Sequence, residues 1–341
     1  MTTLPIIRPV TLADLDQIHE LARKTGGGMT NLPPDRDALA ARIEQAIEGF
    51  SADAKEPGGE VYFCVLDVGG TVVGTTAVFS AIGLESGFVN YKLNWVFHAS
   101  QQLGKRIRRR LLVPTYDFTG ASEVGSLFLS RETRGSGYGK LLARSRYLFI
   151  AQNPDIIADP VCAELRGWRA PDGGTPFWDA LGRHFFDMEF EEADVHNSTT
   201  GNQFIADLMP RISIYVVLLP EDAKECIGRP HDNAAPAYHM LTTEGFEYKG
   251  YIDIFDGGPL LSARKQDIVS IRNSALAAVN IAPSGLDENK VTDSIIAAGQ
   301  TKDFRATRAP AIIGGDQITI SDETARALGV GKGDQVRHVA W

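Results

Sequence analysis

Cysteine is scarce in this sequence, and long apolar runs are missing. The 341 residues include three cysteines, Cys64, Cys162 and Cys226, which are far apart and form no CxxC pair. This spacing gives neither a disulfide framework nor a zinc site. No window is apolar over the length that crosses a bilayer, and the first residues lack the basic start and apolar core of a secretory signal. The sequence therefore predicts a soluble cytoplasmic protein that needs no metal.

A surplus of positive charge is also missing. Lys and Arg total 34 against 43 Asp and Glu, which gives a formal net charge of −9 at pH 7. This balance argues against nucleic acid as a partner, so an anionic ligand has to be held by local groups. One segment, Lys105–Arg110, is strongly basic. In an acidic chain without a repeated aromatic–basic pattern, it is interpreted as an exposed face or an anion-contacting loop.

The length exceeds what one small core supports, so we expect one large α/β domain with appendages, or two domains. Composition changes near Ser262, and the remaining tail reads as strands and a short helix separated by a glycine-rich turn. We place a main domain over residues 1–261 and a small β-rich subdomain over residues 262–341.

Local patterns predict the first elements of the main domain. Residues 6–8 form a short strand, and Thr11 is a plausible N-cap for the helix that follows. A second helix is expected over residues 35–49. The paired glycines in the turn 67–70 predict a β-hairpin, and residues 90–100 read as a further strand.

Three alternating glycines stand between another predicted strand and a helix. Residues 126–130 alternate as a strand within a sheet does, and apolar spacing from Tyr138 onward predicts a helix. Glycine permits positive φ and lets a ligand approach the main chain closely. Main-chain N–H groups at the start of a helix attract anions. A pyrophosphate would fit such a turn, which contains Gly135, Gly137 and Gly139.

Two familiar phosphate loops do not match this turn. The GxxxxGK[ST] loop needs Ser or Thr after Lys140, where Leu141 stands, and GxGxxG fails because the glycines are evenly spaced. A turn that only reverses the chain is the alternative. The strand, the helix and the flanking cations Arg134 and Lys140 favour the phosphate cradle.

Arg134-x-x-Gly137-x-Gly139 between strand and helix resembles the pyrophosphate motif of the GNAT acyl-CoA transferase superfamily. The opening strand, helix and hairpin resemble the first elements of that fold. The resemblance implies a GNAT-like α/β fold, with a mixed, mostly antiparallel splayed sheet flanked by helices. It also implies coenzyme A contacts from the strand and the turn, through Leu127, Phe128, Leu129, Arg134, Gly135, Ser136, Gly137, Tyr138, Gly139 and Lys140.

Longer motifs in the same order resemble one family of that superfamily, arginine N-succinyltransferase. The similarity extends from about Ile6 to Pro259 and weakly through the tail, and it includes "KTGGGMTNLP", "FTGASEVGSLFL", "AELRG", "PFWDALGRHFFDMEF", "IGRPH" and "EGFEYKGYIDIFDGGP". The family implies transfer of a succinyl group from succinyl-CoA to the α-amino group of L-arginine. We expect direct attack in a ternary complex, because none of the cysteines has a nearby His pattern that would activate it. The basic run departs from the neutral segment expected there.

Histidine suits the proton exchange of amide formation, because the amine must lose a proton and the leaving thiolate must gain one. The resemblance maps the proton-donor histidine onto His231, in the polar loop "GRPHDNAAPA" before a helix. The alternative is that His231 only caps this helix. His98, at the end of a strand, is a candidate for the acceptor site. His184 lies among aromatic residues and is interpreted as a packed core residue.

The two substrate ends need opposite charges, because succinyl carries a carboxylate and arginine a guanidinium. Glu164 and Arg166 are two apart on the predicted strand "AELRG" and should share one face of the sheet. They are candidate substrate-binding residues, with an internal ion pair as the alternative. Asn90 and His98 are further substrate-binding candidates.

Two other functions stay open on the sequence. The chain could succinylate ornithine as well, or acylate another amine. It could also be a non-catalytic acyl-CoA-binding subunit. Either way we expect a homo-oligomer or a pair with a paralogous subunit, and no membrane partner.

Overall fold

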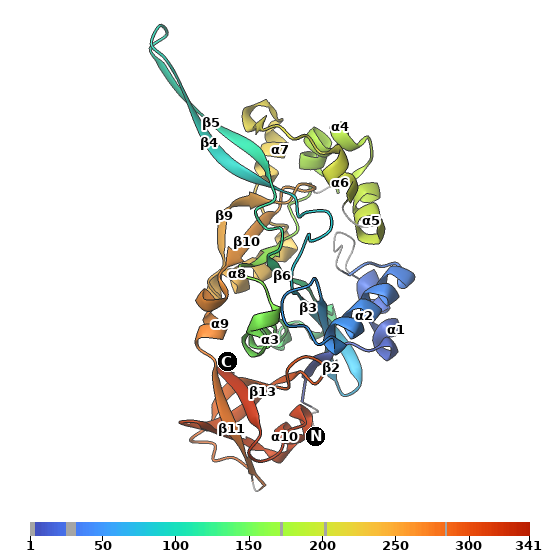
Figure 1. Ribbon diagram of the computed structural model, residues 1–341, viewed down its shortest axis with the longest axis vertical. Helices are drawn as coiled ribbons and strands as arrows, with labels where there is room; N and C mark the ends of the chain where they lie inside the picture. Colours follow the sequence, from blue (N-terminus) through green and yellow to red (C-terminus); the bar gives the residue numbers. More distant parts are fainter. Residues whose placement is uncertain (1–3, 25–31, 171–172, 201–202, 284) are drawn as a thin grey trace. The chain divides into compact units, whose positions relative to one another are not determined.

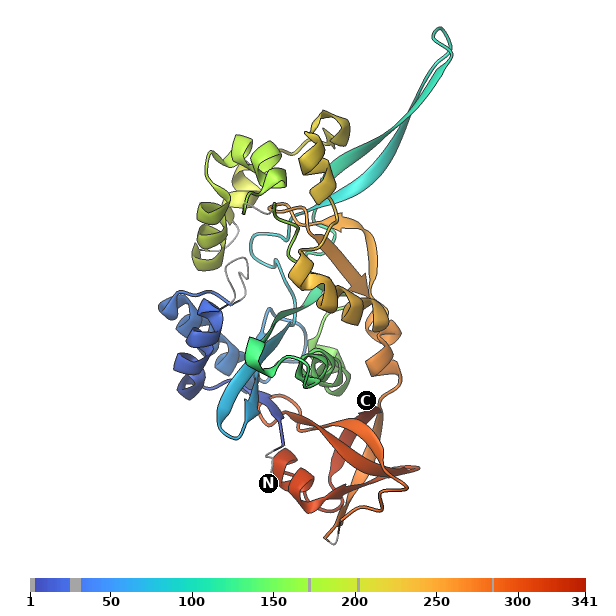
Figure 2. The same cartoon turned by 180° about the vertical axis from the view of Figure 1, so that it is seen from behind.

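The computed structural model describes residues 4–24, 32–170, 173–200, 203–283 and 285–341, and Figures 1 and 2 show it from opposite sides. Its chain forms two compact units. The first comprises Met1–Ala81, Ser122–Asp159 and Arg264–Trp341, and the second comprises Ile82–Ala121 and Pro160–Ala263. The predicted boundary near Ser262 lies where the chain passes from the second unit into the first.

The strands of the first unit pair in the order β12-β15-β11-β14-β13-β1-β2-β3-β6. The strand pairs are antiparallel except for β11 with β14. Because β12 also pairs with β13, the five C-terminal strands close on themselves. The strands are β1 Ile6–Pro9, β2 Val61–Val68, β3 Thr71–Phe79, β6 Ser122–Leu129, β11 Ala275–Ala282, β12 Thr292–Ala298, β13 Arg305–Gly314, β14 Gln317–Ser321 and β15 Gln335–Ala340.

The helices of the first unit are α1 Leu15–Arg23, α2 Arg36–Ser51, α3 Tyr138–Gln152, α9 Val269–Arg272 and α10 Asp322–Leu328, with short 3-10 turns η1 Leu12–Asp14, η2 Arg131–Thr133, η3 Pro154–Ile156 and η7 Lys265–Asp267. Helix α3 joins the N-terminal and C-terminal parts. Its Phe149 lies edge-on to Phe304, with ring centroids 5.1 Å apart, and 4.8 Å from the Tyr62 ring. These rings are buried, so the C-terminal strands share this core.

The second unit has an antiparallel sheet in the order β7-β10-β9-β4-β5-β8. Its strands are β4 Asn90–Ser100, β5 Lys105–Thr115, β7 Val161–Glu164, β8 Ile214–Tyr215, β9 Glu247–Ile252 and β10 Pro259–Ala263. Its helical segments are the π-helical η4 Trp178–Gly182, the α-helices α4 Arg183–Phe186, α5 Phe190–Thr200, α6 Gln203–Leu208, α7 Glu221–Cys226 and α8 Ala235–Thr243, and the 3-10 turns η5 Val216–Leu218 and η6 Asp232–Ala234. Trp178 centres the core, stacked between Phe186 and Phe255.

The predicted fold class, a GNAT-like mixed α/β sheet with helices and a C-terminal β-rich module, is confirmed. The predicted hairpin is also confirmed, since β2 and β3 meet at Gly69 and Gly70, which both have positive φ. The opening helix starts as the 3-10 turn η1 before α1 begins. Residues 25–31, within the motif "KTGGGMTNLP", lie outside the described residues.

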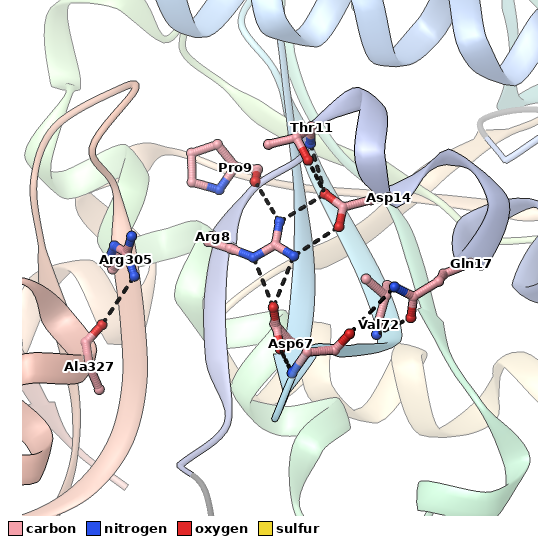
Figure 3. Close-up of polar contacts among 10 residues, drawn as sticks. Arg8, Pro9, Thr11, Asp14, Gln17, Asp67, Val72, Arg305 and Ala327 are labelled. Atoms are coloured by element: carbon pink, nitrogen blue, oxygen red, sulfur yellow. Dashed lines mark hydrogen bonds and ion pairs between the residues drawn. The ribbon is translucent and has the colours of Figure 1, made fainter.

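A charged cluster fastens the start of the chain to the β2–β3 hairpin (Figure 3). The Arg8 guanidinium donates to both carboxylate oxygens of Asp14 at 2.8 Å and to Asp67 at 2.9 and 3.1 Å. Asp14 also accepts from the main chain and hydroxyl of Thr11. Burial opposes ionisation of Asp14, but the hydrogen bonds from Arg8 and Thr11 prevail and hold its pKa below the usual value.

Replacing Arg8 should destabilise the first unit through Asp14. In Arg8→Met this carboxylate stays buried without its cation, so we expect a loss of about 3 kcal/mol in the free energy of unfolding at neutral pH. The native pKa of Asp14 is lowered, so its stabilisation is lost as the pH falls through that pKa. The difference between the two proteins should therefore shrink below about pH 4.

Urea unfolding of both proteins across this pH range measures the difference. Arg23→Met is the matched control, because Arg23 forms an exposed pair with Glu20 and should change stability by about 0.5 kcal/mol or less. An equal loss in both variants would show that Asp14 does not depend on Arg8.

Candidate functional site

Strand β6 carries a bulge just before the residues predicted to contact the cofactor. Its register with β3 runs from Gly125 opposite Ala77 to Phe128 opposite Thr75, so two residues of β6 face one of β3. Ser126 takes φ 50°, which is rare for a residue with a side chain, and its carbonyl accepts from the Thr75 hydroxyl at 2.8 Å. Bulges of this kind re-aim a strand beside functional sites. Here the bulge immediately precedes the half-buried segment Leu127–Leu129.

The glycine turn connects this strand to α3. Gly135 and Gly137 both have φ 85°, and Gly137 is the N-cap of α3. The Ser136 hydroxyl donates to the Thr133 carbonyl at 2.6 Å and accepts from the Tyr138 N–H at 3.3 Å. The first turn of a helix has no intrahelical acceptors for its N–H groups. The turn therefore has the anion-attracting geometry expected from the sequence.

The C-terminal strands come close to this turn. A Cβ on Gly137 would meet Arg308 Nη1 at 3.1 Å and the Trp341 ring at 3.2 Å. The Lys140 ammonium lies 4.4 Å from the centroid of the Trp341 ring, and the Arg308 guanidinium lies 4.1 Å from it. A cavity of about 250 Å³ opens beside the turn, between Tyr138 and these strands. Arg308, which sequence reasoning missed, thus stands at this turn with Lys140, and its guanidinium is paired with the Asp293 carboxylate of the same cavity.

In the second unit, two loops pair and bring the predicted histidine beside an arginine. Gly167 forms an antiparallel bridge with Pro230, and the His231 N–H donates to the Arg166 carbonyl at 2.8 Å. The Asp256 carboxylate accepts from the Gly167 N–H at 2.7 Å. Any Cβ on Gly167 would lie 2.5 Å from the Asp256 carbonyl, so only glycine fits this approach.

His231 is half-buried and has a defined tautomer. Its Nδ1 accepts from the Asn233 N–H at 3.0 Å, so the helix-capping role considered for it is present. In the neutral ring the proton is therefore on Nε2. Burial, followed by the Arg166 guanidinium, lowers the pKa of His231, and Asp232 acts in the opposite direction. At neutral pH His231 is a neutral side chain with an N–H donor.

Two guanidinium groups stand near His231 with incomplete hydrogen bonding. The Nε atoms of Arg166 and Arg169 are buried and have no hydrogen-bond partner within the described part of the chain. Arg169 lies over the Phe190 ring at 4.4 Å and reaches Glu191 at 4.0 Å. Burial, and next the Arg169 charge, lowers the pKa of Arg166. An anion placed here would satisfy donors and reduce repulsion between the cations.

The other predicted substrate residues fall in two places. Asn90 is buried on β4, and its amide donates to Glu164 Oε1 at 2.8 Å. Strand β7 ends at Glu164, so Arg166 lies beyond the strand on which the sequence placed it. His98 is eight residues from Asn90 along β4, about 26 Å at strand spacing. The structure brings Asn90 and Glu164 together and leaves His98 apart from them.

Two other histidines show how well local sequence context predicts the position of a side chain. His98 is exposed, with Nε2 3.4 Å from the Tyr215 hydroxyl. The interpretation of His184 as a core residue is wrong, because it is exposed on α4 while Phe186 turns into the core. Sequence reasoning also missed Arg169, although its signal was present as a second arginine in "ELRGWR".

The described residues contain neither a helix long and apolar enough to span a membrane nor a cluster of three His, Cys, Asp or Glu side chains that could hold a metal ion.

A bulged strand that runs through a glycine turn into a helix, within a mixed α/β domain, is the arrangement expected from the sequence for a GNAT-type acyltransferase. Residues 5–270 match the family model described as arginine N-succinyltransferase beta subunit, and residues 276–340 match the model of its C-terminal domain. The chain belongs to this arginine N-succinyltransferase family.

Relatives are similar to it over their full length. Arginine N-succinyltransferase subunit beta of Pseudomonas aeruginosa is 39% identical, with 98% of this chain and 97% of the relative covered. Subunit alpha of the same organism is 37% identical, with 98% and 99% covered. The solved structure of arginine/ornithine succinyltransferase subunit AI from Pseudomonas aeruginosa superposes with a TM-score of 0.89 at 35% identity, over 99% of both chains.

The titration of His231 should report the neighbouring cations. We expect its pKa to lie below the ordinary value of about 6.5 and to rise toward it in Arg166→Met, because this change removes a cation that disfavours the imidazolium. NMR titration of ring-labelled histidine measures both values, and the signal is assigned by its loss in His231→Asn. Arg183→Met, on α4, is the control and should leave the titration unchanged. A pKa at or above 6.5 in the unmodified protein would contradict this account.

Proposed function

We propose that this chain transfers the succinyl group of succinyl-CoA to the α-amino group of L-arginine. The observation that carries the proposal is the pair of half-buried guanidinium groups, Arg166 and Arg169, whose buried Nε atoms have no hydrogen-bond partner among the described residues and which stand beside the imidazole of His231. A dicarboxylic acyl group supplies the anion that such a pair requires. Membership in the arginine N-succinyltransferase family and the names of the relatives support the reaction.

The coenzyme A end is assigned to the first unit. In this proposal the N–H groups of the turn from Arg134 to Lys140 bind the pyrophosphate, and the main chain of Leu127–Leu129 pairs with the pantetheine arm. The positive φ of Gly135 and Gly137 and the bulge at Ser126 support these roles. The exposed side chains of Arg134 and Lys140 add positive charge.

The chemistry assigned to His231 follows from its tautomer. The neutral α-amine attacks the thioester carbon, and the C–S bond breaks as the amide C–N bond forms. The Nε2–H of His231 donates a hydrogen bond to the leaving sulphur and stabilises its developing negative charge, and the sulphur takes up the proton that the attacking nitrogen loses. The exchange leaves the ring neutral, which is consistent with its lowered pKa. The cap from Asn233 holds the ring in the donor orientation.

The acceptor end is assigned to Glu164 and Asn90. The bond between them orients the carboxylate, which suits a guanidinium or another cationic side chain. A solved relative is named arginine/ornithine succinyltransferase, so ornithine is the second acceptor to be tested. His98 stays a candidate from the sequence alone.

Assembly and location complete the proposal. Relatives named subunit alpha and subunit beta match this chain at similar identity. We expect assembly either with further copies of the chain or with a paralogous subunit. Because acyl-CoA thioesters are cytoplasmic metabolites, we expect the reaction in the cytoplasm.

Release of free thiol from acyl-CoA tests the reaction directly. The purified chain should turn over succinyl-CoA with L-arginine, and the panel of acceptors should include ornithine and lysine. His231→Asn should lower turnover by about two orders of magnitude or more while stability is kept, because Asn caps helices well but places no N–H donor at the position of Nε2. His239→Asn, on α8, is the control.

Two outcomes would count against this assignment. Full turnover by the stable His231→Asn protein would leave His231 with the capping role alone. Absence of thiol release by the unmodified chain with every acceptor would favour the non-catalytic subunit.

Acyl selectivity tests the two arginines. Arg169→Met should reduce kcat/KM for succinyl-CoA by about 10- to 100-fold, the value of one charged hydrogen bond. It should leave acetyl-CoA turnover unchanged or higher, because acetyl has no carboxylate to lose its partner. Arg183→Met serves again as the control with the same change of charge. An equal decrease in kcat/KM with both acyl donors would mean that Arg169 supports the fold and does not bind the carboxylate of the acyl group.

A further inference from the structure

The hairpin of β4 and β5 extends well beyond the rest of the second unit's sheet (Figures 1 and 2). The two strands pair along their whole length, from Asn90 opposite Thr115 to Ser100 opposite Lys105. Other described strands pair with the hairpin only near its base, β9 at Tyr91 and Lys92 and β8 at Leu111 and Leu112. Residues 94–110 are called the arm below. A free two-stranded ribbon is marginally stable in water and leaves open edges, so the arm is suited to a partner.

One face of the arm alternates aromatic and cationic side chains across the strands. Trp95 lies opposite Arg110, and Phe97 lies opposite Arg108. Trp95 is 49% exposed and Phe97 is 74% exposed. The Arg108 guanidinium lies 3.5 Å from the centroid of the Trp95 ring. Exposed aromatic residues and arginine are the residue types enriched at the centres of protein interfaces.

The charge of the arm is opposite to that of the chain. It carries five cations and no carboxylate, with Arg106 exposed near its tip. The whole chain has a formal net charge of −9, so the remainder is more acidic than the whole. A second copy of the chain therefore offers complementary charge. A nucleic acid would be attracted by the arm and repelled by the rest.

The same unit exposes side chains of complementary chemistry within one short segment, residues 212–225. Next to the short strand β8, three apolar side chains are 48% to 77% exposed. Helix α7 begins after the last of these and two further residues, and it carries three exposed carboxylates, one of which, Glu221, also pairs with Lys224 of the same helix. This apolar–acidic surface consists of Ile212, Val217, Leu218, Glu221, Asp222 and Glu225.

We propose that the arm of one copy docks on the apolar–acidic surface of a second copy, and that the second arm docks reciprocally on the first. Aromatic rings of the arm cover the exposed apolar residues, and its arginines face the carboxylates of α7. Because each arm docks on the partner's surface in the same way, the two contacts are equivalent and the pair closes as a two-fold dimer, whereas one-way docking would leave an arm and a surface open. This inference does not depend on the proposed reaction.

Charge reversal of either surface should break the dimer. The arm variant carries Arg106→Glu, Arg108→Glu and Arg110→Glu, and the α7 variant carries Glu221→Lys, Asp222→Lys and Glu225→Lys. Sedimentation equilibrium of the unmodified chain should give twice the 37.0 kDa monomer mass. Each variant alone should dissociate at least about tenfold more readily. An equimolar mixture should regain the dimer, because each reversed arm then meets a reversed surface.

A matched control variant carries Lys55→Glu, Lys290→Glu and Arg326→Glu, three exposed cations of the first unit, and should stay dimeric. Circular dichroism and melting temperature establish that each variant is folded. The proposal is overturned if the unmodified chain is a monomer, if either variant or the mixture fails to behave as stated, or if the control dissociates equally. A monomer that binds a single-stranded oligonucleotide through the arm in fluorescence anisotropy would assign the arm to nucleic acid.

Discussion

The turn between β6 and α3 depends on positive φ angles, which residues with a side chain rarely adopt. Gly135 and Gly137 both take positive φ, and an added Cβ on Gly137 would press on Arg308 and Trp341. These two glycines let the strand end and the helix begin within a few residues. The N–H groups of the first turn of α3 consequently stand at the end of the sheet. Everything proposed for coenzyme A follows from this arrangement.

Helix α3 packs against both the N-terminal and the C-terminal strands, and this packing fixes the turn at its start. One face of the helix packs on β3 and β6, and it also contacts β12, β13 and β15 of the C-terminal strands. Arg144 makes this second connection explicit, since it donates to the Ser270 hydroxyl at 2.8 Å and to the Ala340 carbonyl at 2.9 Å. The C-terminal strands therefore form part of the support for the turn, which gives this module a structural role in the first unit.

The second unit builds its candidate site from loops instead of regular elements. Pairing of Gly167 with Pro230 places Arg166 next to His231, and the Asp256 carboxylate secures the approach. The same contacts explain the state of the imidazole. Its cap fixes the tautomer, and burial, followed by the nearby Arg166 guanidinium, lowers the pKa of the ring and keeps it neutral. Capping and catalysis, which the sequence presents as alternatives for His231, are compatible in this geometry because Nδ1 accepts the cap and Nε2–H stays available as a hydrogen-bond donor.

Local patterns in the sequence were sufficient to predict the hairpin at Gly69 and Gly70, the strand over residues 90–100 and the start of α3. Alternation, helical spacing and glycine turns each depend on residues a few positions apart, so the sequence shows them directly. They also carried the family resemblance and the fold class. Tertiary structure decided that Arg166 lies beside His231, that Arg169 joins them and that His184 is exposed. Those features depend on segments far apart in the chain, and no local pattern encodes which loops meet. The basic run Lys105–Arg110 shows the same division. Its charge is visible in the sequence, but its position opposite Trp95 and Phe97 results from the pairing of β4 with β5.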